Sequence, residues 1–294
     1  MNEEMLEGIY DLHVHTAPDI SERKLDDIDY AKIMEQYNMA GFCIKSHYFN
    51  TAERAKLVKK SHPSIEAIGA LALNNSVGGL NPEAVLMAAK SGAKVIWMPT
   101  FDAKNEREYL LKNSYGVLPP WAQVQKNNDK KQEVPGITIL EDKQIKEEVK
   151  EIVAICKEQD LILASGHLSK TETLELAKYA RNEQYKKLVI THPTFSSIAF
   201  SIEEQLELLE YGATLEQCYG VVQEHYGISW DGMYEIFKRT GDKNVIISSD
   251  LGQIENPFPH DGLLDFINKL LEQGFSKQFV KNITRENQLK LLGG

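Results

Sequence analysis

The stretch LILASGHLSKTETLELAKYARNEQYKKLVITH, residues 161–192, contains the unit on which the interpretation of the whole chain rests. An apolar run at 161–165 is followed by a helix pattern that begins at Ser169, with Glu172 three residues later as in a capping box. A second apolar run, at 187–191, comes soon after that helix. Two strands joined by a helix of this length pair in parallel, because a parallel connection needs a long crossover. The stretch therefore predicts one βαβ unit.

The same alternation of strand and helix runs along the whole chain. Eight apolar runs are expected as strands, at residues 9–15, 42–46, 65–73, 93–98, 161–165, 187–191, 212–218 and 244–249. Helix patterns follow them, at 26–40, from 50, 81–92, 141–159, 169–185, 201–211, 230–240, 262–272 and 276–292. Eight successive βα units close into a (β/α)8 TIM barrel, and an open doubly wound sheet is the alternative. We therefore expect an α/β protein with one barrel domain over residues 1–294.

One interval breaks the alternation, between the fourth strand and the helix pattern at 141. An insertion of about residues 101–140 contains Pro119-Pro120-Trp121 and the polar run Asn127–Lys131. Long irregular segments in compact domains are usually functional or disordered, and this one leaves the barrel face that carries active sites. We expect the insertion to border or cover the pocket, with the first motif as an apolar cap and the second as a mobile tip.

The composition excludes several classes of partner. The chain has 43 acidic and 33 basic residues, a net charge of −10, which argues against nucleic acid because phosphate binding needs a basic surface. Cys43, Cys156 and Cys218 form no CxxC motif, as is typical of a reducing compartment. No segment resembles a signal peptide or a membrane span of about 20 apolar residues. We expect a cytoplasmic protein without membrane partners that acts on a small molecule, and the composition is compatible with a homo-oligomer.

Polar side chains stand at the ends of the expected strands. His13 and His15, in DLHVHT, are one residue apart and so point to the same side of a strand. Other strand ends supply further candidates: Lys45, His47, His167, His192, Glu216 and Asp250. In a barrel these ends converge on one rim, where burying so many imidazoles without a partner costs several kcal/mol. Neutral imidazole and carboxylate are ligands of divalent metal ions, so the pattern predicts a metal site. Asp19 and Arg23 follow the first strand and could line its mouth.

With these residues the sequence resembles the amidohydrolase superfamily of metal-dependent barrel hydrolases. The matching pieces are Asp11-Leu12-His13-Val14-His15, His167, His192 and Ser249-Asp250, in that strand order, and the ending Asn287–Gly293 is also similar. The resemblance implies one ion held by His13, His15 and Asp250, with His167 and His192 holding a second ion or orienting the substrate. It implies Zn²⁺, or else Mn²⁺, Fe²⁺ or Ni²⁺, as one or two ions.

The sequence departs from that superfamily at several positions. Many two-metal members place a bridging Lys or Glu on strand four, but residues 94–100 end without one. Lys45 could be carboxylated and bridge two ions, or could be a free ammonium that binds an anionic group of the substrate. A weaker similarity to PHP phosphoesterases rests on His47, although their third-strand Glu and final Asp-x-His are missing, so its role as a ligand is open. Glu216 is either an acid of the site or the partner of a ligand histidine.

These observations predict hydrolysis of an amide, lactone, ester or phosphoester bond in a small polar molecule. A bound metal ion lowers the pKa of its water toward about 7, and Asp250 is expected to act as the base. Lys45 and Glu216 are the other catalytic candidates. The alternatives are a single-metal lyase or decarboxylase on the same barrel and a non-catalytic barrel that binds metal or ligand.

Overall fold

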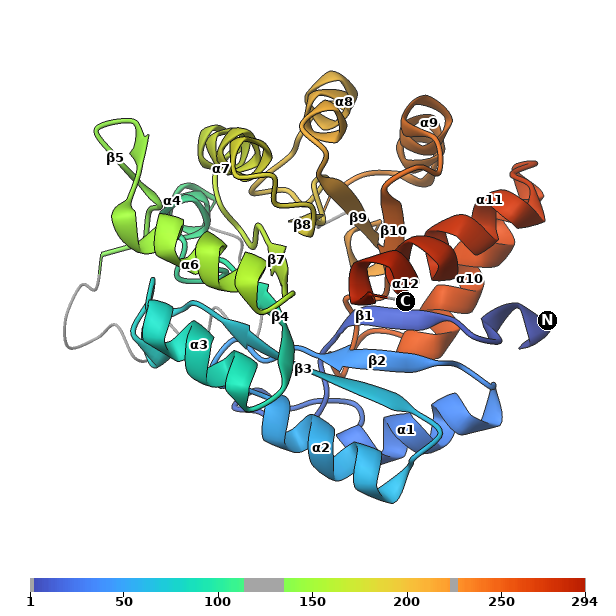
Figure 1. Ribbon diagram of the computed structural model, residues 1–294. Coiled ribbons are helices and arrows are strands. Elements are labelled where there is room, and N and C mark those ends of the chain that lie inside the picture. Colours follow the sequence, from blue (N-terminus) through green and yellow to red (C-terminus); the bar gives the residue numbers. More distant parts are fainter. Residues whose placement is uncertain (1–2, 114–134, 223–226, 294) are drawn as a thin grey trace.

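The computed structural model describes residues 3–113, 135–222 and 227–293, which form a barrel of parallel strands surrounded by helices (Figure 1). The main sheet has eight strands in the order β1-β2-β3-β4-β7-β8-β9-β10, and neighbours in this order pair in parallel. The strands are β1 (Tyr10–Val14), β2 (Gly41–Ile44), β3 (Glu66–Ala72), β4 (Ala93–Trp97), β7 (Ile162–Ala164), β8 (Leu188–Thr191), β9 (Thr214–Cys218) and β10 (Val245–Ser248). The predicted (β/α)8 TIM barrel is confirmed, and the doubly wound sheet is excluded because the first and last strands meet.

Helices follow the strands as the punctuation of the sequence indicates. They are α1 (Asp27–Gln36), α2 (Ala52–Ser61), α3 (Pro82–Lys90), α4 (Lys104–Lys112), α6 (Glu147–Glu158), α7 (Lys170–Asn182), α8 (Ile202–Glu210), α9 (Trp230–Thr240), α10 (Pro259–Glu272), α11 (Lys277–Lys281) and α12 (Asn287–Leu292). Short 3₁₀ turns are η1 (Glu3–Leu6), η2 (Asn75–Val77) and η4 (Tyr219–Val221). Ser169 with Glu172, and Ser201 with Glu204, form complete capping boxes. No helix in the described part of the chain is long and apolar enough to cross a membrane.

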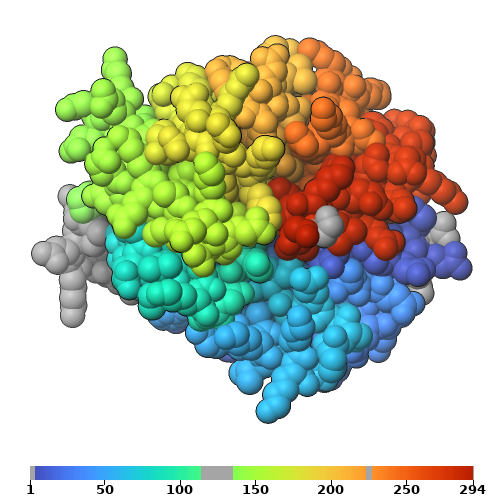
Figure 2. All heavy atoms as spheres, viewed as in Figure 1, coloured from blue at the N-terminus to red at the C-terminus, as the bar shows by residue number. Residues whose placement is uncertain are grey.

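The inside of the barrel is a packed core of its own. Leu12, Val95, Ile162 and Ile246 are among the buried inward side chains, and Leu291 of α12 packs onto them. A second and larger core lies between the strands and the surrounding helices. Figure 2 shows α12, in red, packed directly against the neighbouring segments on this face of the molecule. With the interior filled, the space left for a ligand is at the other ends of the strands.

The barrel closes just beyond the ends of its first and last strands. The backbone amide of Asp250 donates to the His13 carbonyl at 2.8 Å, and the amide of His15 donates to the Leu251 carbonyl at 2.8 Å. A parallel bridge also joins Val14 to Leu251. The residues that close the sheet therefore include three of the predicted metal ligands.

Three segments differ from the sequence prediction. Within the interval predicted as a structureless insertion, residues 104–112 form α4. The segments predicted as an apolar cap and a mobile tip lie outside the described residues. The predicted helix at 141–159 begins only at 147, because β5 (Leu140–Glu141) and β6 (Gln144–Ile145) form a small hairpin. Asp142 and Lys143, in the turn of this hairpin, have φ of 47° and 64°. Such a turn usually contains a glycine, and its absence here left the hairpin unrecognised in the sequence. The predicted helix at 276–292 is divided by η5 (Asn282–Glu286), a π-helical turn.

Candidate metal centre

The C-terminal ends of the strands meet around a small cavity of about 80 Å³. Five histidine rings form a closed series there, with neighbouring ring centres 5.0–6.4 Å apart: His13, His15, His47, His167 and His192. Most predicted site residues line the cavity itself, namely His15, Lys45, His47, His167, His192 and Asp250. His13 lies beside them, against Asp250 and Lys45, whereas Glu216 is not part of the cavity wall.

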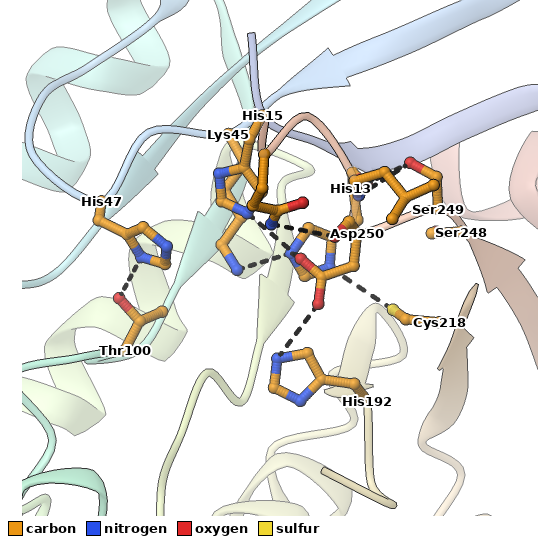
Figure 3. Close-up of polar contacts among 12 residues, drawn as sticks. His13, His15, Lys45, His47, Thr100, His192, Cys218, Ser248, Ser249 and Asp250 are labelled. Atoms are coloured by element: carbon orange, nitrogen blue, oxygen red, sulfur yellow. Dashed lines mark hydrogen bonds and ion pairs between the residues drawn. The ribbon is translucent and has the colours of Figure 1, made fainter. Parts of the chain in front are cut away.

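His13, His15 and Asp250 bring three donor atoms within reach of one ion. Asp250 Oδ1 lies 2.9 Å from His13 Nε2 and 3.2 Å from His15 Nε2 (Figure 3). A divalent ion bonded at about 2.0–2.2 Å to two ligands holds them roughly 3.0–3.4 Å apart at octahedral to tetrahedral angles. The spacing of these donors therefore fits a divalent metal ion.

His47, His167 and His192 are more loosely arranged around the same cavity. His192 Nε2 is 4.0 Å from Asp250 Oδ2, and His47 Nδ1 is 2.8 Å from Thr100 Oγ1. Among the residues that the structure describes, the preformed trios of donors are His13 with His15 and Asp250, and His13 with Glu216 and Cys218. The chain thus brings together one trio of candidate ligands at the cavity, and His47, His167 and His192 lie farther from one another.

The protonation of three of the five histidines suits a metal ion. Burial lowers the pKa of His15, His47 and His192 well below the ordinary histidine value, so these imidazoles are neutral. Burial alone would raise the pKa of Asp250, but His13, His15 and Lys45 hold it well below the ordinary carboxyl value. Within the described residues, the buried Nδ1 atoms of His15 and His192 have no hydrogen-bond partner, which is rare for buried polar atoms.

Lys45 occupies the place beside His13 that an ion would need. Its Nζ lies 2.7 Å from His13 Nε2 and 5.1 Å from the centre of the Trp97 ring, and the residue is only 1% exposed. Burial lowers the pKa of this ammonium, although Asp250 and Glu216 oppose the change. Because one nitrogen lone pair cannot serve both, Lys45 and a metal ion compete for His13.

Glu216 contacts the opposite side of His13. Its Oε2 lies 3.1 Å from His13 Nδ1, and its Oε1 accepts a hydrogen bond from Ser248 Oγ at 2.8 Å. A carboxylate at one ring nitrogen holds the proton there and turns the other nitrogen, as a lone pair, toward the cavity. The placement of Glu216 thus corresponds to the partner of a ligand histidine.

Two of the candidate residues have unusual backbone conformations. Asp250 has φ of 51° and His192 has φ of 27°, in the region that residues other than glycine seldom adopt. His192 directly follows β8, and Asp250 is the second residue after β10. Such strain persists where the surrounding structure enforces it and is concentrated at functional sites.

The sequence alone did not identify Glu106, which supports His167. It projects from α4, is 1% exposed, and its Oε2 lies 3.2 Å from His167 Nδ1, off the line of a good hydrogen bond. Ser197 Oγ donates a short hydrogen bond to the same oxygen. Asn105 fixes the local backbone by donating to the carbonyls of His167 and Ser197. Glu106 lies in the interval predicted to be irregular, so no strand or helix register pointed to it.

Asn74 and Thr100 are a second pair that sequence reasoning missed. Asn74 Nδ2 donates to the His47 carbonyl at 2.9 Å and to Thr100 Oγ1 at 2.7 Å. The Asn74 Oδ1 atom accepts from the Thr100 amide at 2.9 Å. Asn74 therefore ties the exits of β2, β3 and β4 together and fixes the ring of His47 through Thr100. Asn and Thr after strands are too common for their position to be a signal.

Comparison with known proteins supplies a family and a fold. A model described as a family of unknown function, DUF6282, matches residues 8–216. No curated protein matches the sequence. Similar structures include an amidohydrolase from Pseudomonas aeruginosa (TM-score 0.61, 10% identity, 99% of this chain and 97% of that chain). The metallopeptidase called dipeptidase AC is similar over 97% of this chain and 98% of that chain (TM-score 0.60, 14% identity).

A third similar structure is the β-aspartyl dipeptidase of Fervidobacterium islandicum AW-1, solved with the dipeptide β-Asp-Leu (TM-score 0.59, 15% identity, 97% of this chain and 73% of that chain). At these identities the likeness shows a shared barrel fold. It agrees with the predicted resemblance to amidohydrolases. The resemblance to PHP phosphoesterases has no counterpart among these three structures.

Proposed function

The chain belongs to DUF6282, a family of unknown function, and we propose that it is a metal-dependent hydrolase of small polar molecules. The observation that carries the proposal is the trio of His13 Nε2, His15 Nε2 and Asp250 Oδ1 at the cavity, spaced at 2.9 and 3.2 Å about the carboxylate. The fold supports it, because similar structures are described as an amidohydrolase and dipeptidases.

In this proposal His13, His15 and Asp250 hold one divalent ion, Zn²⁺ or else Mn²⁺, Fe²⁺ or Ni²⁺. Such an ion, when bound, lowers the pKa of water toward about 7 and polarises the bond to be cleaved. These two effects promote the hydrolysis of amide, lactone, ester and phosphoester bonds alike. His167 and His192 orient the substrate or hold a second ion, and His47 stands where it could join them.

Asp250 is the residue to which we assign proton transfer. Its Oδ1 faces His13 and His15, whereas its Oδ2 lies on the side of His192. The side chain is 16% exposed and lines the cavity. A carboxylate in this position can take a proton from water with one oxygen and deliver it to the leaving group. General acid–base catalysis of this kind contributes about 100- to 10,000-fold to the rate.

Lys45 and Glu216 have different roles in this mechanism. Glu216 acts through His13, which it orients from behind, so it is a positioning residue. Lys45 lies beside His13 and lines the cavity, so with an ion bound to His13 its ammonium would be free to bind an anionic group of the substrate. Carboxylation of Lys45 to bridge two ions is the alternative, and the mass of the intact protein distinguishes the two.

A single-metal lyase or decarboxylase is the second candidate function. It is compatible with one observation: among the described residues, a single preformed trio of donors lies at the cavity, and β4 ends without a bridging acid or lysine. The two reactions differ in their products, since hydrolysis consumes water and decarboxylation releases CO₂.

The test is an activity screen of the metal-loaded protein over esters, lactones, amides, phosphoesters and small carboxylic acids. We expect hydrolysis that is lost on chelation, restored by Zn²⁺ or Mn²⁺, and absent from the His13→Ala/His15→Ala protein. Metal-dependent CO₂ release without hydrolysis would replace the hydrolase with the lyase. Turnover that survives complete removal of metal would contradict both.

A further inference from the structure

We propose that Arg23 forms a carboxylate-binding subsite, so that the substrate of this enzyme carries a free carboxylate beside the bond that is cleaved. The inference rests on the hydrolase proposed above and names the class of its substrate. Arg23 lies between β1 and α1 and lines the same cavity as His15, His47 and Asp250.

The Arg23 guanidinium is held in place by Asp19. Arg23 Nε and Nη2 both donate to Asp19 Oδ2, at 2.9 and 2.6 Å. The other carboxylate oxygen, Oδ1, accepts from Ser46 Oγ at 3.2 Å and from the Ile20 amide at 2.8 Å. The side chains of Arg23 and Asp19 are 4% and 0% exposed. Both oxygens of Asp19 therefore accept hydrogen bonds from the protein, and the Arg23 guanidinium is held in place without a ligand.

A second arginine shows what a purely structural pair looks like in this protein. Arg54 donates to both oxygens of Asp27, each at 2.8 Å, and Nη2 also reaches the Thr16 carbonyl at 2.9 Å. Arg23 instead donates from two nitrogens, Nε and Nη2, to a single oxygen of Asp19. The Nη1 groups of both arginines make no hydrogen bond within the described part of the chain, but only the guanidinium of Arg23 borders the cavity. The free donors are therefore available to a ligand.

The charges around the cavity favour an anionic ligand. Arg23 and Lys45 place two cationic side chains in the wall of a site that we expect to hold a divalent cation as well. An anion between Arg23 and the metal ligands would relieve this repulsion and accept charge-assisted hydrogen bonds.

A carboxylate matches this subsite better than a phosphate. The cavity of about 80 Å³ is small, and a guanidinium that already pairs with Asp19 offers less compensation to a dianion than to a monoanion. The remaining polar wall consists of Gln253, Glu255 and Asn256, and the Glu255 carboxylate opposes a dianion.

The test uses hydroxamates, because a hydroxamate anchors on a metal ion without being cleaved. Binding to the Zn²⁺-loaded protein is measured by calorimetry for acetohydroxamate, for hydroxamates with a distal carboxylate on chains of several lengths, and for their carboxamide counterparts. We expect the best carboxylate to bind about 10- to 100-fold more tightly than its carboxamide, the range of a charge-assisted hydrogen bond. Acetohydroxamate sets the baseline.

Two paired substitutions separate the subsite from the fold. Asp19→Asn/Arg23→Gln removes both charges together, so that neither partner is left as an unpaired buried charge. It should abolish the preference for carboxylate over carboxamide while acetohydroxamate binds as before. Asp27→Asn/Arg54→Gln is the matched control and should keep the preference. Arg23→Lys should keep part of it, because the charge remains while the fork is lost.

Each other outcome has a definite meaning. If acetohydroxamate fails to bind the wild-type protein, the metal site and with it the subsite are overturned. If acetohydroxamate binds but carboxylates gain nothing over carboxamides, the subsite alone is overturned. Inorganic phosphate that competes more strongly than acetate, and only when Arg23 is present, would overturn the carboxylate in favour of a phosphate.

Discussion

His13 and Asp250 are joined twice, once through the backbone and once through their side chains. The Asp250 amide donates to the His13 carbonyl at 2.8 Å, and Asp250 Oδ1 lies 2.9 Å from His13 Nε2. The same two residues therefore close the barrel and bring the candidate ligands together. The metal site should be as rigid as the closure of the sheet, and damage to the closure should weaken metal binding.

Gly252 is the position at which this coupling can be tested. A Cβ atom there would lie 1.7 Å from the His15 carbonyl oxygen, and the backbone has φ of 129°. We predict that Gly252→Ala lowers the free energy of unfolding by about 3 kcal/mol or more, from clash and backbone strain together, and weakens metal binding. Urea unfolding and metal titration measure the two effects.

The matched control for Gly252 is Gly212. It has φ of 87°, but a Cβ there would meet nothing within 4 Å. Gly212→Ala should cost only about 1–2 kcal/mol for the left-handed conformation and leave metal affinity unchanged. Equal losses of stability and metal affinity in both variants would show that the contact with His15 is unimportant.

Asp250→Asn separates a catalytic role from a structural one. The amide keeps the shape of the carboxylate but loses the basic oxygen. At equal metal occupancy we expect turnover to fall about 100- to 10,000-fold. Turnover per bound metal, with circular dichroism as the check on folding, is the measurement. Near-normal turnover at full occupancy would remove Asp250 from the mechanism, and the base would then be sought among Glu216, His167 and His192.

Glu106→Gln tests whether the buried carboxylate behind His167 positions that ring. The substitution keeps the hydrogen bond from Ser197 but removes the charge 3.2 Å from His167 Nδ1. Removal of such partners typically costs about 10- to 100-fold in metal affinity or activity, and we expect a loss in that range. Glu108→Gln, at a half-exposed position on the same helix, is the control and should behave as wild type. Indistinguishable kinetics for the two variants would contradict the positioning role.

The capping box of α8 gives a pH dependence of stability. The pKa of Glu204 is below its ordinary value of 4.5, because Lys170 and the Ser201 amide outweigh partial burial. A depressed carboxyl pKa stabilises the fold above the unfolded-state value of about 4.3, and this contribution is lost as pH falls through the folded value. Glu204→Gln should therefore lower the free energy of unfolding by about 1 kcal/mol at neutral pH.

The difference in the free energy of unfolding between wild type and Glu204→Gln should shrink as the pH drops below about 4, where the wild-type carboxyl takes up its proton. Glu203→Gln, in the same turn but 72% exposed, is the control with a small difference at every pH. Urea unfolding across this range is the measurement. A difference in the free energy of unfolding that stays constant with pH would contradict the lowered pKa of Glu204.

The sequence was sufficient for the barrel because local signals and the global fold agree. Ser169 with Glu172 and Ser201 with Glu204 mark helix starts by chemistry that needs no distant partner. His167 and His192 could be placed because parallel strands bring their ends to one rim. This placement requires only the order and direction of the strands, so errors of one or two residues in the strand bounds do not change it.

The supporting residues could not be found in that way. Glu106 reaches His167 from a helix after β4, and the pairing of Arg23 with a single oxygen of Asp19 depends on how one loop folds. Spacing also left the role of Glu216 open, since only its distance to His13 Nδ1 places it behind the ligand. Contacts of this kind are set by side-chain packing, which no periodicity encodes.

The central claim is that His13, His15 and Asp250 hold a divalent metal ion. The most direct measurement is the metal content of the wild-type and His13→Ala/His15→Ala proteins after dialysis against Zn²⁺ and then against metal-free buffer. The account predicts at least one equivalent in the wild type and close to none in the variant, with the same helical circular dichroism in both. A folded wild-type protein without metal, or a variant that keeps the same amount, would contradict the account.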